Sequence, residues 1–94
     1  MRQSAWTDVR YRNRTEIISQ ILEAANDPLG IAKTKLMYKV FLSYEPLEGY
    51  LKVVIKNDLL RYDSVTRTFK TTEKGLRFLN LYNKIDYLTK EEQI

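Results

Sequence analysis

The first clear pattern along the chain is an apolar stripe at helical spacing. Its members recur every three or four residues: Ile17, Ile18, Ile21, Leu22 and Ala25. Asn13 stands just before the stripe and Glu16 three residues later, a pairing typical of a helix start. Pro28 disfavours helical backbone in the residue before it, and Gly30 lets the chain reverse. The pattern therefore predicts a helix that begins after Asn13 and ends before Pro28, with a short extended stretch at Ile31.

Two more helical patterns follow, joined by a tight turn. The first covers about Lys33 to Val40, and its inward residues are predicted to be Leu36, Met37 and Val40. Residues 41–43 make the turn, and Ser43 is a good N-cap for a helix over about Tyr44 to Asn57. On a helical wheel, the inward side of this third helix holds Leu47, Tyr50, Leu51, Val54 and Ile55. Its outward side holds Glu45, Glu48, Gly49, Lys52 and Lys56.

The last third of the chain predicts a hairpin and a long helix. Two β-prone runs, residues 59–63 and 68–71, flank the polar tip 64–67, and a last helix starts near Thr72. The order helix, helix, turn, helix, hairpin, helix is that of an α+β winged helix-turn-helix, a three-helix core with a β-hairpin wing. We expect a basic N-terminal arm (1–12), a winged helix-turn-helix domain (13–71) and a C-terminal dimerisation helix (72–94).

Composition excludes several kinds of chemistry. The chain has 94 residues, the size of one domain, and has no cysteine and no histidine. Disulfides, zinc fingers and Cys- or His-based catalysis are therefore excluded. With three glycines, the sequence also has no Gly-rich phosphate loop. We expect a protein that is not an enzyme and that uses no cofactor, metal or small-molecule substrate.

No apolar run approaches the ~20 residues of a membrane-spanning helix. The sequence MRQSAWTDVRYR at the N-terminus lacks the apolar centre of a signal peptide. We expect a protein without a membrane partner, located in the cytoplasm and associated with the nucleoid.

Basic residues outnumber acidic ones, and the excess is concentrated at the start. Lys and Arg number 16 against 12 Asp and Glu, which gives a formal charge of +4 and a pI near 9.4. Residues 1–14 hold four arginines and one aspartate, whereas residues 72–94 hold four charges of each sign. The arm has too few large apolar groups to fold alone. It is either an unstructured start or docked strand, or an arm that contacts phosphates or the minor groove.

The third helix and the wing are the elements that a winged helix-turn-helix turns toward DNA. Predicted backbone contacts come from Lys33, Lys35, Lys39, Arg67 and Lys70. Predicted groove-facing residues are Tyr44, Glu48, Lys52 and Lys56. Simple solvation of the lysines and of the wing turn is the alternative interpretation. Glu45 and Glu48 indicate either selective reading of cytosine or a third helix that does not insert deeply into the groove. Alternatively, they stabilise the positive end of the helix dipole, with Glu48 paired to Lys52, and need no ligand.

The last helix carries an apolar stripe beyond the needs of a small core. Leu76 and Leu79 share one side, which we expect to pack on the domain. A second stripe at 3-4-3 spacing is formed by Phe78, Leu81, Ile85 and Leu88. We expect this stripe to be the seam of a homodimer, with folding back onto the same domain as the alternative.

Four segments carry a resemblance to a known family: Arg14–Leu22 (RTEIISQIL), Lys33–Tyr44 (KTKLMYKVFLSY), Gly49–Lys52 (GYLK) and Phe69–Leu79 (FKTTEKGLRFL). Over about residues 13–85 the chain resembles the small archaeal winged helix-turn-helix proteins related to the ten-kilodalton "a" DNA-binding proteins of Sulfolobus. The resemblance implies a homodimer through an antiparallel coiled coil of the C-terminal helices. It also implies binding of double-stranded DNA with little sequence preference, in transcription regulation or chromatin-type DNA organisation. A winged helix that binds only proteins is the alternative function.

Overall fold

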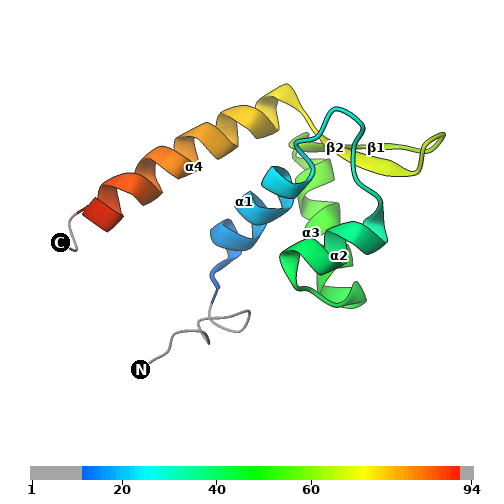
Figure 1. Cartoon of the computed structure of the whole chain (residues 1–94), viewed down its shortest axis with the longest axis horizontal. Coiled ribbons are helices and arrows are strands. Elements are labelled where there is room, and N and C mark those ends of the chain that lie inside the picture. Colours follow the sequence, from blue (N-terminus) through cyan, green and yellow to red (C-terminus); the bar gives the residue numbers. More distant parts are fainter. Residues whose placement is uncertain (1–11, 92–94) are drawn as a thin grey trace.

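The computed structural model describes residues 12–91, and the predicted arm up to Tyr11 lies outside this range. Four helices and a two-stranded antiparallel hairpin follow in the predicted order (Figure 1). They are α1 (Arg14–Ala24), α2 (Lys33–Val40), α3 (Tyr44–Lys56), β1 (Leu60–Asp63), β2 (Thr68–Thr71) and α4 (Glu73–Glu91). The predicted α+β winged helix-turn-helix is thereby confirmed.

Helix α1 begins where the capping pattern predicts. The Asn13 side-chain oxygen accepts a hydrogen bond from the Glu16 backbone N–H at 2.7 Å, which satisfies one of the free donors of the first turn. The apolar face of α1 is buried from Ile17 to Ala25 and forms the centre of the core. Gly30 then reverses the chain with φ at +77°, a backbone conformation that glycine adopts without strain.

The helix-turn-helix is built from α2 and α3. Leu36 and Val40 of α2 and Leu47, Leu51 and Val54 of α3 are all buried in the core. Phe41 ends α2 in the left-handed region, with φ at +54°, where its N–H donates to the carbonyl of Met37. Ser43 occupies the predicted N-cap position of α3, but its side chain makes no capping hydrogen bond.

The wing is the β1–β2 hairpin, in which Tyr62 pairs with Phe69 and Arg61 with Lys70. Ile31 is a second, single-residue partner of β2, through two backbone hydrogen bonds with Phe69, of 2.8 and 2.9 Å. This confirms the extended stretch predicted at Ile31. Because successive residues of a strand point to opposite faces, Phe69 is buried against the domain while Lys70 lies exposed on the other face.

Thr72 fastens the end of α3 to the start of α4. Its hydroxyl donates to the Asp58 carbonyl at 2.7 Å and accepts from the Gly75 N–H at 3.0 Å. The Thr72 N–H donates to the Leu59 carbonyl at 3.0 Å, and Lys74 Nζ donates to the Asn57 carbonyl at the same distance. The α3–β1 junction and the first turn of α4 are therefore joined by several short-range bonds.

Helix α4 packs on α1 and β2 and then projects beyond the domain, on the opposite side from the hairpin tip (Figure 1). Leu79 is buried, and Leu76 and Phe78 are partly buried against the core. With 19 residues, the helix is about 28 Å long at ~1.5 Å per residue. Its projection explains why the molecule measures 47 Å in its longest dimension but 26 and 21 Å in the others.

Candidate nucleic-acid interface

An open groove of about 770 Å³ lies between α3 and the wing. Both elements contribute charged and apolar side chains to it. The lining residues are Lys33, Glu48, Leu51, Lys52, Ile55, Lys56, Tyr62, Arg67 and Phe69. The groove thus brings together five of the residues that the sequence predicts to face DNA.

The floor of the groove is more apolar than the sequence predicts. Ile55 was expected inward with Leu51, but it is 40% exposed and lies on the groove side of α3. The reason is its position at the edge of the apolar sector of the helix, where α3 turns toward the wing and not toward the core. The Tyr62 ring packs against the Phe69 ring in a tilted arrangement, with ring centroids 4.8 Å apart and an interplanar angle of 46°. These side chains form a hydrophobic surface between the cationic groups.

Lys33 of α2 and Glu48 of α3, which both line the groove, form an ion pair. The hydrogen bond from Lys33 lowers the pKa of the Glu48 carboxyl below its ordinary value, and the same bond raises the pKa of the Lys33 ammonium. Lys33 Nζ also lies 4.8 Å from the centre of the Tyr44 ring, close enough for a cation–π contact. Glu48 is therefore paired with Lys33 of α2, and Lys52, the partner that the sequence suggested, acts on the Glu48 pKa only as a nearby positive charge.

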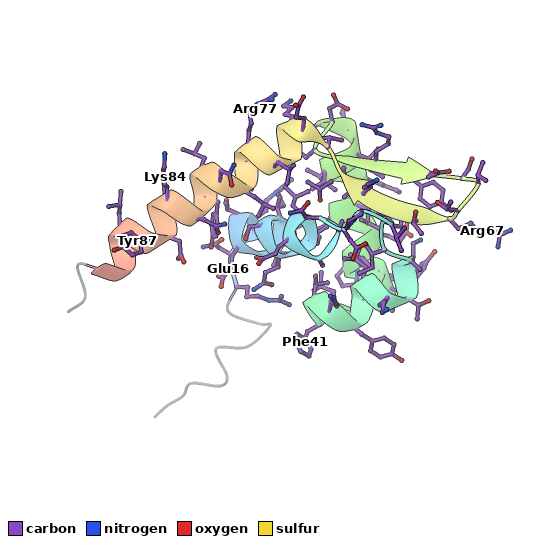
Figure 2. The ribbon with its side chains drawn as sticks, turned by 45° about the horizontal axis from the view of Figure 1, so that its top comes forward. Glu16, Phe41, Arg67, Arg77, Lys84 and Tyr87 are labelled. Carbon is purple, nitrogen blue, oxygen red and sulfur yellow. The ribbon has the colours of Figure 1, made fainter. Side chains whose placement is uncertain are left out.

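Lys52 and Lys56 are exposed along the outward face of α3, next to the groove floor. Arg67 extends from the tip of the wing away from the body of the domain (Figure 2). Its backbone is left-handed, with φ at +58°, and its N–H donates to the Asp63 carbonyl at 2.7 Å. The Asp63 side chain accepts from the Val65 N–H at 2.8 Å, which fixes the turn. Two separate elements therefore present cations on the rim of one groove.

Four predicted contact residues are not among the residues that line the groove. Lys35 and Lys39 are exposed on α2, and Lys70 lies beside Arg61 on the opposite face of the wing. Tyr44, 55% exposed, lies at the Lys33 end of the groove. None of these four residues lines the groove, and Tyr44 contacts Lys33, which does.

Arg12 has a structural role that the sequence did not reveal. It was assigned to the arm, but its guanidinium donates to the carbonyl of Val40 at 2.8 Å and to that of Phe41 at 3.3 Å. It also donates to the side chain of Gln20 in α1. Arg12 thus satisfies carbonyls at the end of α2, where a cation is favourable to the helix dipole. No local pattern indicated this contact, because its acceptors are 28 and 29 residues away.

The second apolar stripe of α4 is only partly free. Leu81, Ile85 and Leu88 are 61%, 54% and 57% exposed, whereas Phe78 is partly buried against the core of its own chain. Phe78 packs against the core of its own domain and is only partly buried. The continuous exposed part of the stripe therefore begins at Leu81.

Within residues 12–91, no cluster of acidic side chains has the geometry to hold a metal ion. In the same range, no helix is long and apolar enough to cross a membrane.

A search of the curated proteins finds no significant match to this chain. The sequence profile of one protein family, described as winged helix-turn-helix, matches residues 11–90. This range includes α4 as well as the helix-turn-helix and the wing. Proteins with this domain typically bind DNA, and the fold is not a catalytic one. Since the match covers most of the 94 residues of the chain, the chain belongs to the winged helix-turn-helix family.

Proposed function

We propose that this protein binds double-stranded DNA through α3 and the wing. The observation that carries the proposal is the groove in which Lys52 and Lys56 of α3 stand beside Arg67 of the wing. Cations on two elements match a duplex, in which phosphates line both edges of the groove that receives the helix. A helix with its side chains is about 10–12 Å wide and the major groove is about 12 Å wide, so α3 fits with its outward face to the bases.

Each element of the interface has a separate task in this proposal. Lys52 and Lys56 contact phosphates or guanine edges, and Arg67 reaches the sugar-phosphate backbone beyond the groove edge. Lys33 neutralises Glu48, which keeps a carboxylate from repelling the duplex and leaves it able to accept from a cytosine amino group. Lys35, Lys39, Tyr44 and Lys70 supply outer contacts to phosphates on either side.

The functional unit is proposed to be a homodimer that pairs through α4. Support comes from the exposure of Leu81, Ile85 and Leu88 on a helix that projects from the domain, since contiguous apolar surface of this kind favours a partner. Phe78 would lie at the inner end of this seam. The unit would act in transcription regulation or DNA organisation, as in the archaeal proteins that the sequence resembles.

Fluorescence anisotropy of a labelled duplex at two salt concentrations tests DNA binding. Each neutralised phosphate adds about 0.9 to the slope of log affinity against log salt. The Lys52→Ala and Lys56→Ala double variant should bind more weakly and lose up to about 2 from this slope. The matched control is Arg77→Ala with Lys84→Ala, which removes the same charge from the outer side of α4 (Figure 2). If the two double variants bind equally, α3 is not the contact surface.

A second titration compares a random duplex with a fragment from upstream of the protein's own gene. Equal, salt-steep binding to both fits a DNA-organising protein, and preference for the upstream fragment fits a regulator. The seam is tested by light scattering of Ile85→Asp, which should be monomeric because it places a charge in an apolar contact. A dimer that survives this change excludes the seam.

Two exposed aromatic side chains favour an alternative function, a protein-interaction module. Tyr38 and Phe41 at the end of α2 are 76% and 72% exposed, and Phe41 points away from the domain (Figure 2). Aromatic residues are enriched where proteins contact each other. Absence of duplex binding even at low salt would favour this alternative.

A further inference from the structure

Gly49 stands in the middle of the recognition helix α3, on its outward face. Glu45 lies one turn before it and Lys52 one turn after it, and at ~100° per residue these positions share the side of the helix opposite the core. Glycine is the least favourable residue for a helix interior apart from proline. A glycine in this position therefore needs a reason.

The fold itself supplies no reason. A Cβ added to Gly49 would meet no atom within 4 Å. The chain's other two glycines differ in this respect. At Gly30 the φ is +77°, and at Gly75 a Cβ would lie 2.3 Å from the Leu59 carbonyl oxygen. Both of those positions require glycine for conformation or space, whereas Gly49 has ordinary helical backbone and open space around it.

We propose that Gly49 is the point of closest approach between α3 and DNA, where base edges of the major groove contact the helix backbone directly. The inference rests on the proposed function and adds to it a contact position on the outward face of α3, outside the residues that line the groove between α3 and the wing. Because the helix and the major groove have nearly the same width, any side chain at the deepest position holds the helix away from the bases. Without one, Glu45 and Lys52 on the adjacent turns reach further toward base edges.

The contact also explains why the residue is not a cation. Binding driven only by charge would favour lysine at an outward position in the middle of α3, as at Lys52 and Lys56. Gly49 contributes no charge and lowers helix stability, so close approach is the property that it provides.

The test measures stability and duplex affinity together for Gly49→Ala and Gly49→Lys. Alanine favours the helix, so Gly49→Ala should raise the Tm by about 3–8 °C. The same variant should weaken duplex binding by about tenfold, the loss of one base contact. Gly49→Lys should also weaken binding, although its added charge would strengthen purely charge-driven binding. Asn80→Ala, at an exposed position of α4, is the matched control and should raise the Tm slightly without changing affinity.

The possible results separate this inference from the proposed function. If the wild-type protein binds duplex and Gly49→Ala binds equally well or more tightly, the close approach is wrong while DNA binding stands. Tighter binding by Gly49→Lys has the same meaning. A lower Tm for Gly49→Ala would show that the fold does need glycine there, which overturns the inference. If the wild-type protein binds no duplex at all, both proposals fail.

Discussion

Replacing Gly75 by alanine is predicted to destabilise the protein, although alanine is the better helix former. Gly75 lies in the first turn of α4, where the helix crosses the α3–β1 junction. The added Cβ would lie 2.3 Å from the Leu59 carbonyl oxygen and 2.6 Å from Cγ2 of Thr71. Real Cβ atoms essentially never come closer than 3.0 Å to another heavy atom, so the helix or the junction must move.

The movement is costly because the obstructing atom is backbone and is already in use. The Leu59 carbonyl accepts the Thr72 N–H at 3.0 Å, and shifting it weakens that bond. Overpacking of this kind costs about 1–3 kcal/mol, and a lost hydrogen bond about 1 kcal/mol more. The helix preference of alanine returns at most about 1 kcal/mol. The net loss of about 1–3 kcal/mol corresponds to a fall in Tm of roughly 5–20 °C for a domain of this size.

Thermal unfolding followed by far-ultraviolet circular dichroism measures this change directly. The matched control is Gly49→Ala, the same substitution in another helix, for which the Tm should rise. A Tm for Gly75→Ala equal to or above that of the wild type would refute the reasoning. It would mean that α4 can move away from the Leu59 carbonyl at no cost and is not held tightly against it.

Three further predictions concern the wing, the ion pair and the start of α4. Arg67→Gly should not lower the Tm, since glycine relieves the φ of +58°, but it should reduce the salt slope of duplex binding by about 0.9, as measured by anisotropy. Glu48→Gln should lose the stability that the wild type gains from a lowered Glu48 pKa and a raised Lys33 pKa. Urea titrations should show the whole difference in unfolding free energy between the wild type and Glu48→Gln at pH values between 4.5 and 10.5, the ordinary pKa values of Glu and Lys. The difference should disappear as the pH falls through the lowered pKa of Glu48 or rises through the raised pKa of Lys33. The Thr72 hydroxyl caps the start of α4 by accepting from the Gly75 N–H. Thr72→Ala should therefore cost about 1–2 kcal/mol of unfolding free energy, whereas Thr72→Ser, which keeps the hydroxyl, should cost much less. Equal losses for the two variants would exclude this capping role.

Local patterns predicted the elements of the fold well. Asn13 with Glu16, the Pro28–Gly30 segment and the β-prone runs around 64–67 each depend on neighbours within a few residues. The nearby sequence is therefore enough to predict where these helices and the hairpin begin and end. The structure agrees with them to within one or two residues at most ends, and places Ile31 beside the wing as expected.

The contacts between elements could not be predicted in the same way. The Lys33–Glu48 pair joins residues 15 positions apart and depends on how α2 crosses α3. Ile55 and Phe78 lie at the edges of their apolar sectors, where a small rotation of the helix decides between core and surface. Arg12 belongs to a charged stretch that reads as surface, yet it reaches the end of α2. The sequence thus predicted several charged residues of the candidate site, but not the apolar side chains that the packing of α3 against the wing places between them.

The hydrogen bonds from Thr72 to Asp58 and Leu59 bear on the spacing of the two DNA half-sites that the proposed dimer would bind. They tie the segment that follows α3 to the start of α4. If the protein binds DNA as the proposed dimer paired through α4, these bonds would keep the two copies of α3 at a set separation. Half-sites one helical turn of about 10 bp apart, or a multiple of it, face the same side of the duplex. Inserting about half a turn between them would rotate one half-site to the far side of the duplex, so such a dimer should bind the altered site more weakly.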